Sequence, residues 1–310
     1  MHIRRDARFP IRPGRHAISP VVRTTGWAMA FWCALASPAA TIRDDVPDSA
    51  YLDLGASSDY ASVGTFVNSW GYTGCGILIA ADWVLTAAHL FTAASSGTFT
   101  LNGTAYTSSQ LITDPNWNSA NVLGGSDIGL IHLSTPVGDV APAALYTGAS
   151  EFGAVGTFVG YGMTGTGLTG ATTLDYHKRG FQNVIDGDFG NPALLLGADF
   201  DNPHSPADNQ FGDATPLAFE GAVANGDSGG GVFITVGGQT YLVGVISAVV
   251  ATDGSANADY GDITAFGRVS AFADWIGGYV PTAVPEPATP VVIMLGGLTF
   301  LLLRSKAGRG

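Results

Sequence analysis

Between about residues 60 and 270, the chain alternates short apolar runs with stretches rich in glycine, asparagine, aspartate, serine and threonine. Short apolar or alternating runs bounded by turn residues are typical of β-strands, and many of them in succession predict an all-β sandwich or barrel. The 43 glycines of the sequence suit turns and bulges in such sheets. The clearest runs are residues 63–67, 76–80, 129–133, 155–161, 232–236 and 241–247.

One segment has a different period. Residues 269–279 place apolar side chains at helical spacing, and Ser270 is a candidate cap. The pattern predicts one short helix at the end of the strand-rich region.

Residues 1–40 have the pattern of a targeting segment. Up to residue 23 the basic residues are all arginine, and an apolar run follows that ends at Ser37, Pro38 and Ala39. This pattern is typical of a secretory signal peptide, with cleavage expected near Ala39 or Ala40. An N-terminal membrane anchor is the alternative, but the apolar run is short for a bilayer span.

Residues 281–310 also differ from the rest. A proline-rich spacer occupies 281–290, an apolar segment occupies 291–303, and three basic residues follow. This apolar segment is marginal against the roughly 20 residues of a membrane span, but a basic flank is typical of the cytoplasmic side. We expect transient or permanent membrane insertion in preference to a buried core helix. Residues 41–280 then form the folded domain.

Charge and cysteine content narrow the function classes. Only four of the 13 basic residues fall within residues 41–280, against all but two of the 25 acidic residues. Such an acidic surface argues against nucleic acid and anionic membranes as partners. Because Cys33 lies in the expected signal peptide, Cys75 stays alone, and no intramolecular disulfide is expected.

The densest glycine cluster surrounds one aspartate and one serine. Residues 224–231 read A-N-G-D-S-G-G-G. Because glycine is costly to order, such a run indicates that the backbone adopts a conformation that other residues cannot. A serine hydroxyl becomes a useful nucleophile when a base removes its proton and a third group holds that base. Ser228 is the candidate nucleophile.

His89 and Asp127 are its candidate partners. His89 ends the apolar run W-V-L-T-A-A-H, and Asp127 directly precedes an apolar strand. A buried carboxylate is costly without a partner, and an imidazole N–H would supply one. Taken singly, these residues fit a structural histidine, a turn aspartate and a glycine-rich connection equally well. The other histidines of the domain, in an alternating strand or in polar stretches, are His132, His177 and His204.

Three motifs in this order resemble those of the chymotrypsin-like (trypsin-like) serine peptidases. They are T-A-A-H at 86–89, D-I-G-L at 127–130 and G-D-S-G-G at 226–230. The resemblance covers roughly residues 60–280. It implies an all-β fold, a chymotrypsin-like double six-stranded β-barrel with a short C-terminal helix, and an active site between the barrels.

The resemblance also implies roles for individual residues. Ser228 would attack the scissile carbonyl, His89 would take and return the proton, and Asp127 would orient the imidazole. The backbone N–H groups of Gly226 and Ser228 would form the oxyanion hole. The implied activity is that of a serine endopeptidase acting on proteins or peptides.

Two departures from the family pattern concern cysteine and activation. Leu90 stands where relatives commonly have the partner of Cys75. In many relatives a newly freed N-terminal Ile or Val pairs with the aspartate beside the nucleophile, here Asp227. No I-V-G-G motif stands upstream, and residues 41–45 offer only a conjectural alternative terminus.

Specificity is expected to differ from that of trypsin. The family's pocket-base position, six residues before the nucleophile, is Ala222, which has no carboxylate to select Lys or Arg. Ala248 and Val249 follow Ser247 where relatives usually have Trp-Gly. Val249 would narrow the pocket, so we expect a preference for small or medium apolar side chains.

No cofactor is expected, because the sequence has no zinc pattern, phosphate loop or dinucleotide fingerprint. One segment is rich enough in carboxylates to raise structural calcium as a weaker alternative, but its spacing misses the standard twelve-residue loop. A solvated acidic loop is the favoured interpretation. Its aspartates are Asp199, Asp201, Asp208 and Asp213.

The C-terminal tail has a resemblance of its own. The sequence V-P-E-P-A-T at 284–289, followed by the apolar segment and the basic end, resembles the PEP-CTERM sorting signal of Gram-negative bacteria. It implies export to the cell envelope or beyond, with processing by an exosortase-type membrane enzyme. An ordinary membrane anchor is the alternative.

Two other functions stay open at this point. One is a catalytically inactive binding or matrix protein on the same fold, because fold does not establish activity. The other is an esterase that uses the same three residues. The sequence does not determine the oligomeric state.

Overall fold

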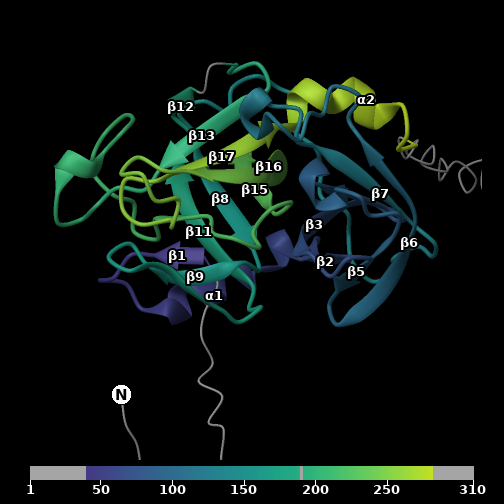
Figure 1. The fold of residues 1–310 in the computed structure, drawn as a ribbon, viewed down its shortest axis with the longest axis horizontal. Helices are drawn as coiled ribbons and strands as arrows, with labels where there is room; N and C mark the ends of the chain where they lie inside the picture. Colours follow the sequence, from purple (N-terminus) through teal and green to yellow (C-terminus); the bar gives the residue numbers. More distant parts are fainter. Residues whose placement is uncertain (1–39, 189–190, 282–310) are drawn as a thin grey trace, which may run out of the picture. The chain divides into compact units, whose positions relative to one another are not determined.

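The computed structural model describes residues 40–188 and 191–281. The expected signal peptide before Ala40 and the expected sorting tail after Pro281 lie outside these residues. The described part is built from strands in three sheets, with few helices (Figure 1). The all-β, chymotrypsin-like fold is confirmed.

Six of the strands form a closed barrel. Its core is made of fully buried side chains such as Phe66, Ile77 and Phe99. Glycine makes room for them, because a Cβ at Gly64 would lie 2.9 Å from the Phe99 ring. Around the barrel the strands are β2 (Val63–Asn68), β3 (Thr73–Ala80), β4 (Trp83–Thr86), β7 (Gly129–Leu133), β6 (Thr104–Thr113) and β5 (Gly97–Leu101).

The second half is a seven-stranded sheet that forms a half-barrel, in place of a second set of six strands. Its core includes Phe158 and Phe181, whose rings stack with centroids 5.0 Å apart, and Phe266 against Phe158. In sheet order the strands are β11 (Arg179–Val184), β8 (Val155–Gly160), β15 (Gly231–Val236), β16 (Gln239–Val250), β17 (Ile263–Arg268), β13 (Leu195–Asp199) and β12 (Gly187–Asp188).

A four-stranded sheet lies beside this half and contains the first described residues. Thr41 pairs with Ala222 in antiparallel register, and Ala40 pairs with Thr164 in parallel register. The strand before the nucleophile is therefore held by the N-terminal segment. In sheet order the strands are β10 (Gly170–Leu174), β9 (Met163–Thr166), β1 (Ala40–Ile42) and β14 (Gly221–Ala222).

The N-terminal segment also carries a helix that the sequence pattern did not predict, α1 (Asp48–Gly55). The negative charge of Asp48 in the first turn stabilises the helix by interacting with the positive end of its dipole. The same carboxylate accepts two N–H groups of the fully buried Arg179, at 2.7 and 2.9 Å. Tyr51 donates to the carbonyl oxygen of Glu220 at 3.0 Å. Tertiary contacts thus fix α1 onto the second half.

The predicted C-terminal helix is present as a 3-10 turn, Val269–Phe272, followed by α2 (Ala273–Gly277). The expected cap at Ser270 is wrong, because the helix begins later. Ser270 instead donates its hydroxyl to Glu151 at 2.7 Å.

Within the described residues, no helix has both the length and the apolar character that crossing a membrane requires. The apolar segment at 291–303 lies outside them, so its membrane insertion stays a prediction.

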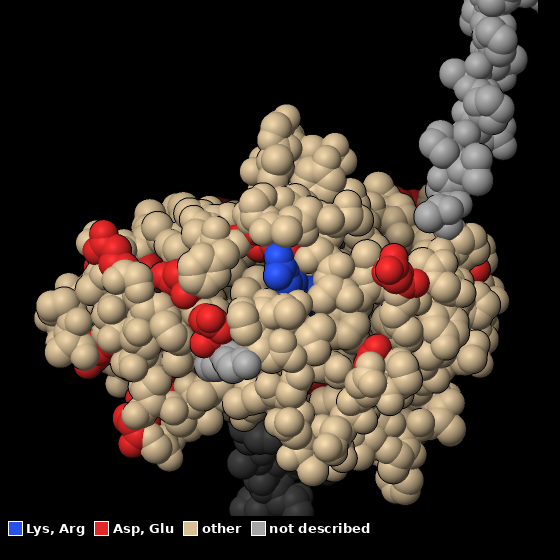
Figure 2. Space-filling view, turned by 90° about the horizontal axis from the view of Figure 1, so that it is seen from above, with Lys and Arg blue, Asp and Glu red and all other residues tan. Residues whose placement is uncertain are grey.

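The basic side chains of the described part each have a partner in the fold. Arg43 pairs with Asp45, Arg179 with Asp48, and Arg268 with Glu151, each at 2.7 Å. Lys178 donates to the carbonyl oxygen of Tyr60, and burial lowers its pKa to about 8. Figure 2 shows one face on which acidic side chains are scattered around a single basic patch.

Candidate functional site

The glycine-rich segment forms two tight turns between β14 and β15. Asp227 donates its N–H to the carbonyl of Ala224 at 3.0 Å, and Gly230 donates to the carbonyl of Asp227 at 2.8 Å. Gly226 has a φ of +97° and Gly229 a φ of +79°, conformations that L side chains rarely adopt. This is the local reason for the dense glycines.

A buried carboxylate holds this loop from behind. Asp227 is 1% exposed and accepts the N–H groups of Gly162 at 2.7 Å and Ala224 at 2.9 Å. Burial raises the pKa of Asp227 to about 6, although the two N–H donors partly offset it. Within residues 40–188 and 191–281, no cationic side chain forms an ion pair with it.

The loop is also tied to the first barrel. Cys75 on β3 donates its N–H to the carbonyl oxygen of Ser228 at 2.7 Å. The Cys75 thiol lies 3.3 Å from the carbonyl oxygen of Gly226, and burial raises its pKa well above the ordinary value. Cys75 is therefore a buried free thiol, as the sequence indicated.

The pairing of β4 with β7 brings His89 and Asp127 together. Thr86 at the end of β4 lies opposite Gly129 at the start of β7, so the residues just beyond these ends face each other. His89 Nδ1 lies 2.7 Å from Asp127 Oδ2, and the His89 backbone N–H donates to Asp127 Oδ1 at 2.8 Å. The Asp127 side chain is 1% exposed.

Ser247 supplies a third donor to this carboxylate. Its hydroxyl lies on β16 of the second half and donates to Asp127 Oδ2 at 2.6 Å. Sequence reasoning had placed Ser247 only in the specificity pocket. Its position within the apolar run 241–247 gave no signal of this hydrogen bond.

His89 and Ser228 line one cavity of about 370 Å³. No hydrogen bond joins Ser228 Oγ to His89, but in free enzymes this bond is often long and tightens with substrate. Across the described residues, the N–H groups of Gly226 and Ser228 have no acceptor. Free backbone N–H groups in a loop beside a nucleophile are the kind of donor that binds an oxyanion.

The predicted specificity residues divide into two groups. Ser247, Ala248 and Val249 line the cavity, and so does Val223. Ala222 does not line it, which corrects the prediction. Its backbone pairs with Thr41, and its side chain is buried in a small apolar cluster with Phe200 and Ala258.

The wall of this cavity is mostly apolar. Two contributors that the sequence gave no reason to expect are Val122 from the segment before Asp127 and Ala256 from the loop between β16 and β17. Among residues 40–188 and 191–281, no Asp or Glu lines it. A positively charged substrate side chain would find no counter-charge on its wall.

The interpretation of a solvated acidic loop is wrong for two of its four aspartates. Asp199 is 3% and Asp201 is 6% exposed. Asp199 accepts the backbone N–H groups of residues 210 and 211, and Asp201 accepts the Asn209 amide. Tertiary packing of β13 covers them. They and the half-buried Asp186 repel one another, and burial raises the pKa of Asp186 and Asp201 to about 6.

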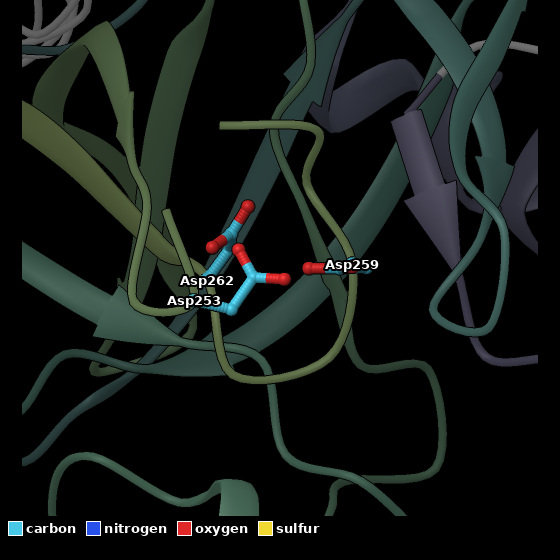
Figure 3. Close-up of side chains that lie close together, drawn as sticks. All are labelled: Asp253, Asp259 and Asp262. Carbon is cyan, nitrogen blue, oxygen red and sulfur yellow. The ribbon is translucent and has the colours of Figure 1, made fainter. Parts of the chain in front are cut away.

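A different group of carboxylates converges in the loop between β16 and β17 (Figure 3). Oxygen atoms of Asp253, Asp259 and Asp262 lie within 4.8 Å of one another. Such a set could hold a cation in geometric terms. However, buried Asp262 already accepts two backbone N–H groups, from Thr252 and Ala258. The sequence spacing gave no sign of this group.

Comparisons with known proteins agree with this geometry. A family model described as Trypsin matches residues 56–276. A solved structure titled HL collagenase is similar with a TM-score of 0.53 and 19% identity, over 73% of this chain and 96% of that one. At this identity the likeness shows the fold alone. No curated protein matches the sequence.

Proposed function

The chain belongs to the trypsin family of serine peptidases, and from this membership and the site geometry we propose that it is an active endopeptidase using Ser228, His89 and Asp127. The single observation that carries the proposal is the shared cavity. Ser228 and His89 both line it, and the buried Asp127 carboxylate lies 2.7 Å from His89 Nδ1, which supports the proposal.

The protons follow from the hydrogen bonds. Because an ionised Asp127 only accepts, the proton of neutral His89 lies on Nδ1, and Nε2 is left free as a base. Nε2 takes the Ser228 proton as Oγ attacks the scissile carbonyl, and later gives it to the leaving amine. Asp127 stabilises the imidazolium that forms in between.

The oxyanion of the tetrahedral intermediate is bound by the N–H groups of Gly226 and Ser228. Water then attacks the acyl-enzyme with His89 again acting as the base. The buried Asp227 supports this step by fixing the loop that carries both donors.

The cavity supports a preference for small or medium apolar side chains before the scissile bond. Val223, Ala248 and Val249 supply apolar wall, and no carboxylate selects Lys or Arg. Model peptides that differ only in this side chain test the point. A dominant preference for Lys or Arg would defeat it.

We also propose export, with the signal peptide removed between Ala39 and Ala40. Ala40 is 3% exposed and begins β1, so this cut keeps the whole strand. Its φ of +64° is costly for alanine by roughly 1–2 kcal/mol. Cleavage removes the preceding peptide bond and with it this strain. The C-terminal signal is proposed to bring the protein to the cell envelope, where an exosortase-type enzyme processes it.

Cleavage at this bond would also complete the nucleophile loop. Because β1 runs antiparallel to β14, Ala40 lies on the side of Thr41 that leads toward Ala224. Ala40 also pairs with Thr164, which follows Gly162 by two residues. Ala224 and Gly162 are the two donors to Asp227. A new cationic amine at Ala40 would therefore point toward the buried Asp227 carboxylate, as the freed termini of relatives do.

Labelling with a fluorophosphonate probe tests the catalytic proposal. We expect rapid labelling of the processed protein at Ser228 and its loss in Ser228→Ala and His89→Ala. Folded, processed protein that is not labelled at Ser228 would favour the inactive binding or matrix protein. Peptide and ester substrates assayed together separate the peptidase from the esterase.

A further inference from the structure

A second Ser–His–Asp group lies on the first barrel, away from the cavity at Ser228. His132 Nδ1 lies 2.9 Å from Ser109 Oγ, and His132 Nε2 lies 3.2 Å from Asp82 Oδ2. None of these three residues lines the cavity that contains Ser228. We call this group the barrel trio.

Strand register explains the barrel trio. His132 on β7 lies opposite Trp83 on β4 and opposite Gln110 on β6. The register with β6 shifts between Ser108 and Gln110, and such a bulge re-aims a side chain. Ser109 is the residue at the shift. His132 and Ser109 thus lie on adjacent strands of the closed barrel, and Asp82 lies in the turn just before β4.

The imidazole has a fixed orientation. Its ring lies against the Trp83 indole with centroids 4.5 Å apart and an angle of 31° between the planes. Trp83 is itself 8% exposed and in contact with Tyr279. Since the indole cannot move freely, the ring nitrogens keep their directions toward Ser109 and Asp82.

The carboxylate determines the tautomer of neutral His132. Ionised Asp82 only accepts hydrogen bonds, so the ring proton lies on Nε2. The lone pair of Nδ1 then faces the Ser109 hydroxyl. The carbonyl oxygen of His132, 3.1 Å from Ser109 Oγ, is a second acceptor for the same hydrogen.

The neighbouring serine provides a natural contrast. Ser109 is exposed, and its hydroxyl faces a base. Ser108 is half-buried, and its oxygen accepts the N–H of Gly97 at 2.8 Å. Only Ser109 of this pair combines access to solvent with a base that can take its proton.

We propose that Ser109 is a second nucleophile of this protein, which accepts an acyl group from activated carboxylic esters. Ser109 Oγ forms a bond to the ester carbonyl carbon as its proton passes to His132 Nδ1. The bond from that carbon to the leaving oxygen breaks, and the alkoxide or phenoxide takes the proton from His132. The products are an O-acyl serine and a free alcohol or phenol.

The reaction is expected to be slow and stoichiometric. A positioned general base contributes about 10²- to 10⁴-fold. One oxyanion donor is worth about 10²- to 10³-fold, and strand N–H groups point along the ladder instead of converging on a side chain. Ser109 should therefore react well above an ordinary exposed serine and well below Ser228.

The experiment uses the processed chain carrying Ser228→Ala, with 4-nitrophenyl acetate as the probe. Intact mass and peptide mapping report the number and position of acetyl groups. We expect one acetyl group on Ser109, and its loss with Ser109→Ala. Ser108→Ala is the matched control and should not change the rate.

The role of the base is tested in the same background. His132→Ala should lower the rate of acetylation at Ser109 by about 10²-fold or more. Asp82→Asn keeps the ring against Trp83 and should lower it less. Thermal unfolding curves identify any variant that fails to fold. If His132→Ala does not fold, the acetylation rate of Asp82→Asn tests the role of the base instead. Acetylation spread over many serines, or a Ser109 rate that Asp82 and His132 do not affect, would overturn the proposal. Neither outcome bears on Ser228.

Discussion

All four histidines of the described residues lie against an aspartate, yet their surroundings differ sharply. Asp127 beside His89 is 1% exposed, whereas Asp82 beside His132 is 42% exposed. Asp127 also accepts a backbone N–H and the Ser247 hydroxyl. Because all four histidines have such a partner, a His–Asp contact by itself does not identify an active site. Burial, extra donors and an adjacent anion pocket distinguish the candidate active site.

The most direct test of this difference is to neutralise Asp127 and Asp82 in turn. Asp127→Asn should lower kcat for peptide hydrolysis by about 10⁴-fold, because the imidazole loses its tautomer and its counter-charge. Asp82→Asn should leave peptide hydrolysis unchanged. Steady-state kinetics on one peptide measures both. Equal effects would mean that burial of the carboxylate is not what matters.

The proposed N-terminus at Ala40 offers the next test. A chain that begins at Ala40 should be active, and the same chain with two residues added before Ala40 should lose about 10- to 100-fold in kcat/KM. Hydrogen bonds to charged groups are worth about 1.5–3 kcal/mol, which sets this range. Full activity in the extended chain would show that β1 orders the loop without its amine.

The third donor to Asp127 can be removed by itself. Ser247→Ala should lower kcat by about tenfold, since one hydrogen bond to a charged group is lost while His89 keeps its own. Because Ser247 also lines the cavity, KM for substrates with small apolar side chains should be followed as well. A change in KM alone would assign Ser247 to substrate binding.

The smallest effect concerns stability and pH. Asp186 has a pKa raised to about 6, and its Oδ1 has no hydrogen-bond partner in the described residues. The folded chain therefore binds a proton that the unfolded chain has released, so stability falls as pH rises from about 4 to 6. Asp186→Asn should raise the free energy of unfolding by about 1 kcal/mol at pH 7 and leave it unchanged below pH 4. One pKa unit corresponds to about 1.4 kcal/mol, and the expected gain is smaller than the full shift implies because water screens a half-buried carboxylate.

Asp82→Asn is the matched control for this measurement, because that carboxylate is 42% exposed and both of its neighbours in the barrel trio are polar. Denaturant unfolding at several pH values gives both results. A gain at Asp186 that is the same at pH 4 and pH 7 would exclude titration as its cause.

The sequence predicted those parts of the molecule that depend on local pattern. Short strands, the late helix, and the motifs around His89, Asp127 and Ser228 follow from residue types in consecutive positions. The closeness of His89 and Asp127 was expected from the cost of burying a carboxylate without a partner and from family resemblance. The structure adds its physical cause, which is the register of β4 with β7.

What the sequence did not predict depends on long-range contacts. α1 is fixed by Arg179, more than a hundred residues away. Asp199 on β13 and Asp201 just after it are buried and hold the N–H groups and amide of the following loop. Ala222 is buried in an apolar cluster with Phe200 and Ala258. The barrel trio was not predicted because His132 has the pattern of an ordinary strand residue. The direction of Ser109 depends on a bulge that the sequence pattern does not show.

The tie between Ser228 and Cys75, together with the Ser247 hydroxyl on Asp127, has a consequence for the newly made chain. Nucleophile and base belong to different halves of the sequence, and neither half carries a working set. Under the proposed function, a chain whose two halves have not yet docked lacks a complete catalytic set, so it would not hydrolyse itself or its neighbours before folding is finished.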